Sequence, residues 1–80
     1  MKIRVESPEH CILIQKYMFE QGYGWGSDPT TVRARRTIGS LYFNSSREIT
    51  RMDTDEMEHF ENSEHPELFL PLDYLRGLNL

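Results

Sequence analysis

The chain has 80 residues, with 13 Asp/Glu against nine Lys/Arg and a single cysteine, Cys11. This length predicts one domain over residues 1–80, and the lone thiol excludes both an internal disulfide and a cysteine-rich zinc site. The thiol, together with the lack of a signal-peptide pattern, favours a reducing cytoplasm, and no apolar run is long enough to span a membrane. Because so small a domain buries a modest core, self-association is the expected way to gain further stability.

The charge is divided along the chain. Residues 1–51 carry eight Lys/Arg against five Asp/Glu, whereas residues 52–80 carry one Arg against eight Asp/Glu. Such polarity can steer a charged partner to one face, although a solvated acidic helix, or one that covers a basic sheet edge, explains it more simply. The sequence pI of about 5.2 argues against binding of duplex nucleic acid, which usually requires a strongly basic domain.

The first elements are a strand and a helix. Residues 1–6 alternate between apolar and charged side chains, which predicts a half-buried strand with Ile3 and Val5 on one face. Ser7 and Pro8 are suited to the N-cap and the first position of a helix. This helix is expected to run to residue 21 and to stop at Gly22, which can adopt the left-handed conformation.

The apolar residues of this helix spread around most of its circumference, and we call them the apolar girdle. An ordinary surface helix buries one stripe and exposes a broad polar face. The girdle is therefore expected to need cover on more than one side, from a second protomer, a partner or the C-terminal part of the same chain. Its members are Cys11, Ile12, Leu13, Ile14, Tyr17, Met18 and Phe19.

The glycine-rich stretch "GYGWG", residues 22–26, follows the helix. A dinucleotide-binding loop has a different glycine spacing and precedes a helix, and no Lys-Ser/Thr pair follows here to make a phosphate-binding loop. The stretch is therefore interpreted as a helix stop that positions Tyr23 and Trp25. The two rings either fold back over the core or stand at the surface, as interface anchors or as stacking platforms for a base.

Residues 31–38 alternate again and predict a second strand, with Arg33 and Arg35 on one face and Arg36 beside them. These arginines are either a solvated strand face or a phosphate-binding set. In the second case a nearby ring, from Tyr42 or the glycine-rich stretch, would stack a base.

The remaining elements are short. Residues 40–52 predict a β-hairpin that turns at 44–47, with Gly39 as a bulge before it. Residues 54–63 predict an acidic helix capped by Thr54, with Met57 and Phe60 facing inward. Residues 68–70 are expected to be extended, and 72–76 to form a last helical turn ended by Gly77.

Together these elements predict an α+β fold. One principal helix packs on a small, mostly antiparallel sheet of about four strands, and short helical segments follow towards the C-terminus.

No catalytic arrangement stands out. Cys11 follows His10 directly on the helix, so the two side chains point apart, and a buried structural thiol is the simpler role. His59 and His65 lack the spacing of metal ligands, and the acidic run around them is more simply a solvated face. We therefore expect no enzyme activity, no metal and no cofactor.

The N-terminal half resembles small accessory proteins of tailed bacteriophages. In those proteins a strand leads through a Ser-Pro-Glu turn into a helix that ends in Phe-x-x-Gly-Tyr-x-Trp. The matching positions are Ser7, Pro8, Glu9, Gln15, Phe19, Gly22, Tyr23 and Trp25. The resemblance implies a protein of the host cytoplasm that binds and inhibits or redirects a host factor, components of antiviral defence included.

Two functional hypotheses follow. The first is a non-enzymatic, self-associating protein that binds a host protein through Tyr23, Trp25 and the arginine strand, with the acidic helix as a second candidate surface. The alternative is a protein that sequesters a small cyclic or modified nucleotide. There the arginines would hold phosphates and an aromatic ring would stack the base; the residues concerned are Tyr23, Trp25, Arg33, Arg35, Arg36 and Tyr42.

Overall fold

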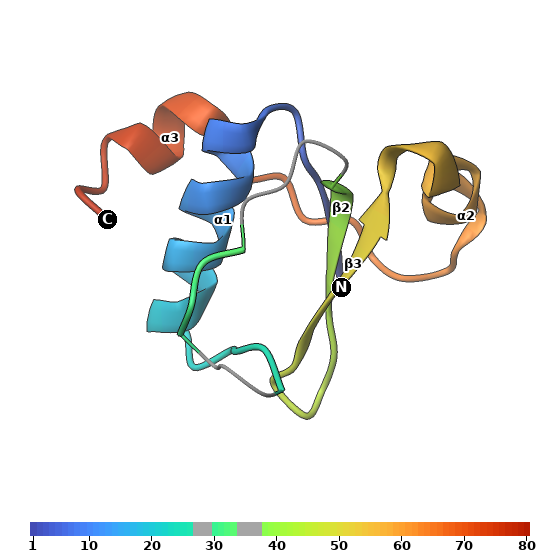
Figure 1. Cartoon of the computed structure of the whole chain (residues 1–80), viewed down its shortest axis with the longest axis horizontal. Helices are drawn as coiled ribbons and strands as arrows, with labels where there is room; N and C mark the ends of the chain where they lie inside the picture. The colour runs from blue at the N-terminus through green and yellow to red at the C-terminus, as the bar shows by residue number, and fades with distance from the viewer. Residues whose placement is uncertain (27–29, 34–37) are drawn as a thin grey trace.

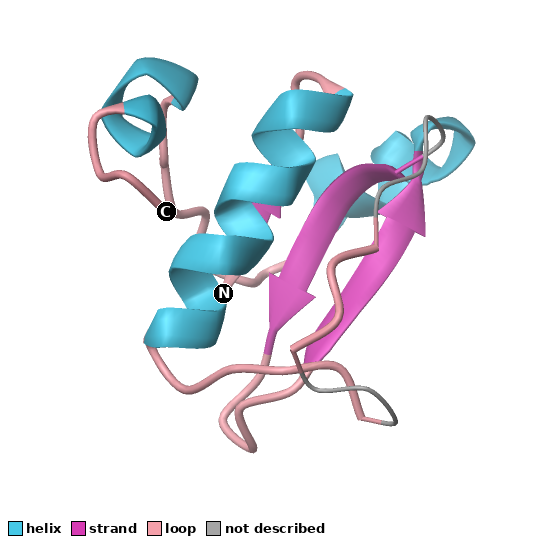
Figure 2. Cartoon of the chain, turned by 60° about the vertical axis from the view of Figure 1, so that its left-hand side comes forward, coloured by secondary structure: helices cyan, strands magenta, loops and turns pink. Residues whose placement is uncertain are grey.

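A computed structural model describes residues 1–26, 30–33 and 38–80 of the chain (Figure 1). The α+β class is confirmed. The principal helix α1 lies on one side of the sheet and α2 on the other, while α3 lies beside α1 (Figures 1 and 2). In chain order the elements are β1 (Lys2–Arg4), α1 (Pro8–Glu20), β2 (Ile38–Phe43), β3 (Ile49–Asp53), the 3-10 turn η1 (Thr54–Glu56), α2 (Met57–Asn62) and α3 (Leu72–Arg76).

The sheet is antiparallel, with β2 between β1 and β3. Lys2 pairs with Tyr42 across β1 and β2, and Tyr42 pairs with Thr50 across β2 and β3. The expected hairpin is therefore confirmed, and so is the irregularity at Gly39, because the register shifts between Ile38 and Ser40.

The described residues contain three strands instead of about four. Within the predicted arginine strand, residues 31–33 are not a strand and Ile38 already belongs to β2. Residues 34–37, which include Arg35 and Arg36, lie outside the described residues. The reason for the difference is visible at Arg33, whose backbone N–H and C=O both bind the side chain of Gln15 instead of a neighbouring strand.

Both edges of the sheet gain one further bridge. Lys2 pairs in parallel with Glu67, through hydrogen bonds of 2.8 Å from Lys2 N to Pro66 O and from Leu68 N to Lys2 O. At the opposite edge Gly24 pairs in parallel with Glu48. The glycine-rich stretch and the extended segment before α3 are thus fixed to the sheet.

The ends of α1 agree with the prediction. Ser7 is the N-cap, its Oγ accepts the N–H of His10 at 3.1 Å, and Pro8 is the first helical residue. Gly22 follows the helix with a φ of +91°, the left-handed conformation expected of it.

The core lies between α1 and the sheet, and it accounts for most of the apolar girdle. Cys11, Ile14 and Met18 are buried there, and the other four girdle residues are half-buried. Part of their cover comes from α3, whose Leu75 is fully buried. Of the three expected sources of cover, the C-terminal part of the same chain therefore supplies one.

The opposite face of the sheet packs on α2 through Phe60, which is fully buried as predicted; Met57 is half-buried. The cations of Lys2 and Arg4 lie 4.4 and 4.8 Å from the Phe60 ring centroid, and Lys2 Nζ donates to the Phe60 and Ser63 carbonyls. Thr54 does not cap α2 as expected. It begins η1, and α2 starts after Glu56 without a side-chain cap.

Candidate functional site

The side chain of Gln15, fully buried in α1, organises the region of the predicted site. Its Oε1 accepts from Trp25 Nε1 at 3.1 Å and from Arg33 N at 2.7 Å. Its Nε2 donates to Arg33 O at 2.7 Å and to Cys11 O at 3.1 Å. The amide thus uses both donors and both acceptor positions, and it holds the Arg33 backbone as a neighbouring strand would.

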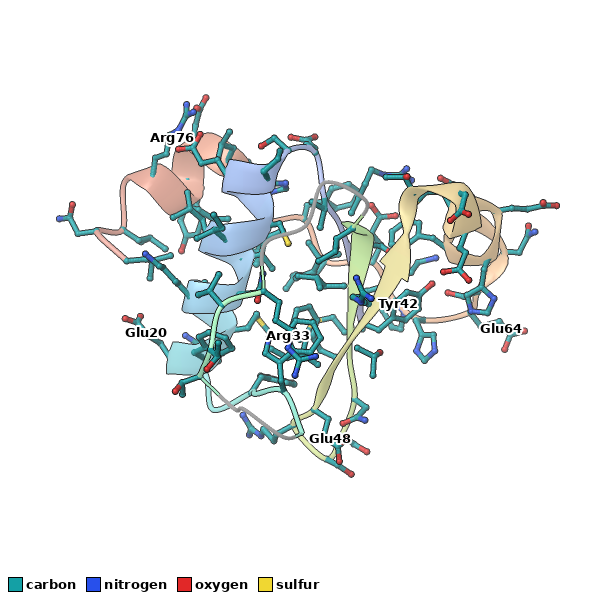
Figure 3. All side chains as sticks on the ribbon, in the orientation of Figure 1. Glu20, Arg33, Tyr42, Glu48, Glu64 and Arg76 are labelled. Atoms are coloured by element: carbon teal, nitrogen blue, oxygen red, sulfur yellow. The ribbon has the colours of Figure 1, made fainter. Side chains whose placement is uncertain are left out.

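Trp25 is a core residue, with 4 % of its surface exposed. Arg33 covers it, with the guanidinium carbon 4.5 Å from the indole centroid (Figure 3 shows Arg33 between α1 and the hairpin). The indole therefore has no open face on which a base could stack. Of the two interpretations of this ring, the structure supports the core aromatic.

Tyr23 is half-buried and meets two other groups. Its ring packs edge-on against Phe43 with centroids 5.5 Å apart, and the Arg47 guanidinium lies 5.3 Å from its centroid. Arg47 also donates from Nη1 to Gln21 O at 2.6 Å. Both rings line an open concavity of about 480 Å³ between the glycine-rich stretch and the hairpin turn.

The structure separates Tyr42 from the other predicted site residues. Its side chain lies on the α2 face of the sheet, 8 % exposed, where its ring meets Phe60, His59 and His65 (Figure 3). Trp25 belongs to the core on the other face, so Tyr42 cannot act together with it. Arg35 and Arg36 lie outside the described residues.

Exposed large hydrophobic side chains gather in a part of the chain that sequence reasoning missed. Among the described residues they are Phe69, Tyr74 and Leu78, which are 76 %, 52 % and 38 % exposed. We call these three the C-terminal apolar residues. A signal for Phe69 was present, since neighbouring side chains of an extended segment point to opposite sides, and Leu68 and Leu70 point towards the core.

The segment that carries these residues is tied to the start of α1. His10 Nδ1 accepts the N–H of Glu6 at 3.0 Å, so the ring proton is on Nε2, which donates to Leu70 O at 2.6 Å. Arg76 donates to both carboxylate oxygens of Glu9, at 3.0 and 2.5 Å. This bidentate hydrogen bond lowers the pKa of Glu9 and raises the pKa of Arg76.

The remaining chemical groups are structural. Burial raises the pKa of the Cys11 thiol, although a hydrogen bond from Gln15 opposes the effect. Both ring nitrogens of His10 already have partners. Asp55, Glu56 and Glu58 line a shallow hollow together with His59 and Asn62. In the described ranges, no set of three or more His, Cys, Asp or Glu could hold a metal ion.

Comparison with protein-family models, with curated proteins and with solved structures finds no match. Within the part of the chain that the structure describes, no helix has the length and apolar character needed to cross a membrane.

Proposed function

We propose that this protein is a non-enzymatic binding protein of bacteriophage type, which binds a host protein in the host cytoplasm and inhibits or redirects it. A component of antiviral defence is one class of target. The context comes from the resemblance of residues 7–25 to small accessory proteins of tailed phages. The contact surface comes from the C-terminal apolar residues, and Phe69 is its central anchor.

One observation carries the proposal: among the described residues, the exposed large hydrophobic side chains all lie within residues 69–78, while Trp25 is buried and the apolar girdle is buried or half-buried. A phenylalanine that is 76 % exposed leaves well over half of its ring in water. A large aromatic side chain so exposed to water is a candidate anchor for a protein partner, because aromatic anchors carry much of the binding energy of an interface.

The test is capture of a host protein by the immobilised protein from bacterial lysate, compared between wild type and Phe69→Ser. Truncation of an anchor typically costs more than about 1 kcal/mol, so the variant should lose at least about fivefold in affinity for the captured protein. Lys16→Ser, an exposed change on α1, is the matched control and should bind as wild type does. Equal capture by wild type and Phe69→Ser would refute the proposed surface.

The nucleotide-binding alternative has its support at the concavity between the glycine-rich stretch and the hairpin turn, which Tyr23, Trp25 and Arg47 line. Its weakness is that Arg33 and Arg47 of the same chain lie over the Trp25 and Tyr23 rings. A thermal-shift screen with cyclic and modified nucleotides tests it, because a ligand that binds only the folded state raises the melting temperature. A shift that Arg47→Ala abolishes would favour this alternative over protein binding.

A further inference from the structure

A small pocket lies directly beside Phe69, between β1, the start of α1 and the segment before α3. Its volume is about 130 Å³, and its apolar lining comes from Ile3, Leu68, Leu70 and Pro71. A cavity of about 150 Å³ accommodates one benzene molecule. The pocket therefore has room for one side chain of a partner.

The rim of this pocket is acidic. Glu6 and Glu67 line it together with Arg4, and Arg4 donates to Glu61 Oε1 at 2.5 Å. The hydrogen bond to Glu61, with the charges of Glu67 and Glu6, raises the pKa of Arg4. Among the lining residues, the carboxylates of Glu6 and Glu67 outnumber the one guanidinium of Arg4, which leaves one negative charge in excess at the opening.

We propose that this pocket binds a lysine or arginine side chain of the partner protein. The apolar lining packs against the aliphatic stem, the carboxylates of Glu6 and Glu67 attract the cationic head, and the Phe69 ring lies beside it. Basic side chains bury their stems in this way while the charge stays near water, and an aromatic face adds a cation–π contact. This inference rests on the proposed function and names the chemistry of the partner that the surface recognises.

Other occupants match the pocket less well. A phosphate or carboxylate would meet the carboxylates of Glu6 and Glu67 at an opening where negative charge is in excess, and the resulting repulsion disfavours anions. A purely apolar side chain would fill the floor, but it would take Glu6 and Glu67 out of water without giving them a partner. A cation on an aliphatic stem satisfies both parts of the pocket.

The experiment uses N-acetyl-lysine methylamide and N-acetyl-arginine methylamide as probes, with N-acetyl-norleucine methylamide as the uncharged control. Binding to the full chain is followed by the methyl NMR signals of Ile3, Leu68 and Leu70. For probes of this size we expect saturable shifts with a Kd of about 1 mM. The norleucine probe should give no saturable shift, and Glu67→Gln should weaken binding about threefold. Glu64→Gln, which changes an exposed carboxylate outside the pocket lining, is the matched variant and should bind as wild type does.

Three outcomes overturn the inference. The first is an absence of saturable shifts with both basic probes, and the second is equal binding of the norleucine probe. The third is a concentration-dependent shift of the Leu68 and Leu70 methyl signals without any probe, which would give the pocket to a second copy of this chain. If the probes fail while Phe69→Ser still loses the captured protein, the pocket inference fails and the proposed function stands. If the probes bind but capture is independent of Phe69, the proposed function fails instead.

Discussion

The hydrogen bonds of Gln15 lead to a quantitative prediction for the variant Gln15→Leu. Leucine has a similar size but offers no hydrogen bond, so the Trp25 Nε1–H and the N–H and C=O of Arg33 lose their partner. A buried polar group without a partner costs about 1–3 kcal/mol. Because Arg33 is only half-buried and water can reach it, we use the lower value for each of the three groups. The expected loss is therefore about 3 kcal/mol.

This loss is large for so small a domain. At about 0.05–0.15 kcal/mol per residue, the total free energy of unfolding is about 4–12 kcal/mol. A loss of 1 kcal/mol lowers the melting temperature of such a domain by about 4–8 °C. A loss of about 3 kcal/mol should therefore lower the melting temperature of Gln15→Leu by about 12–24 °C.

Urea unfolding measures the effect. The single tryptophan, Trp25, reports on the site by fluorescence, and far-UV circular dichroism reports on the helices. Gln21→Leu is the matched control, because Gln21 is exposed at the end of α1 and its loss should change stability by less than about 0.5 kcal/mol. A loss below about 1 kcal/mol for Gln15→Leu would show that the network contributes little and would refute the reasoning.

Three further predictions concern single residues. Because the Cys11 thiol is buried and its pKa is raised, its reaction with a thiol reagent at pH 7 should be at least about tenfold slower in the folded protein than in urea, and equal rates would contradict this. The hydrogen bond from Arg76 lowers the pKa of Glu9 in the folded state below its usual value of 4.5. The pair therefore stabilises the docked α3 at pH values above 4.5, and this stabilisation is lost as the pH falls through the lower pKa of the folded state. NMR signals of α3 should therefore shift with acid in wild type and lack that transition in Arg76→Ala; identical titrations would contradict the pairing. Gly22→Ala should lower the free energy of unfolding in urea by about 1 kcal/mol, because the φ of Gly22 is +91°. Gly26→Ala should leave it nearly unchanged, since no atom lies within 4 Å of the added Cβ. Equal effects of the two substitutions would contradict the conformational explanation.

The parts of the fold that could be predicted depend on local signals. Ser7, Pro8 and Gly22 act within one helical turn of the positions they define, so both ends of α1 could be predicted from the sequence. The hairpin likewise follows from neighbouring residues. The strand expected over residues 31–38 was wrong for residues 31–33, because their alternating pattern is also compatible with a loop. A side chain 18 residues away, Gln15, satisfies the backbone of Arg33 there, and no local pattern indicates that contact.

The candidate site was harder to predict because side-chain orientation depends on such distant contacts. Tyr23 and Trp25 are two residues apart, yet only Trp25 reaches the acceptor of Gln15 and becomes a core residue. Phe69 looks like its neighbours in an apolar run, and its exposure follows from the pairing of Leu68 with Lys2 across the edge of the sheet. The sequence therefore led to a hypothesis of protein binding without indicating that Phe69 is exposed.

The first strand and the start of α1 are held by residues that lie 60 or more positions later in the sequence, and this has a consequence for folding. The strand formed by the first residues pairs with residues 40–42 and with Glu67, and the start of the long helix is bonded to Leu70 and Arg76. Residues 2–10 therefore cannot complete their native contacts until residues 67–76 are in place, and contacts between residues so far apart in sequence slow folding. Until these contacts form, part of the apolar girdle lacks its cover, which favours chaperone binding to the partly folded chain.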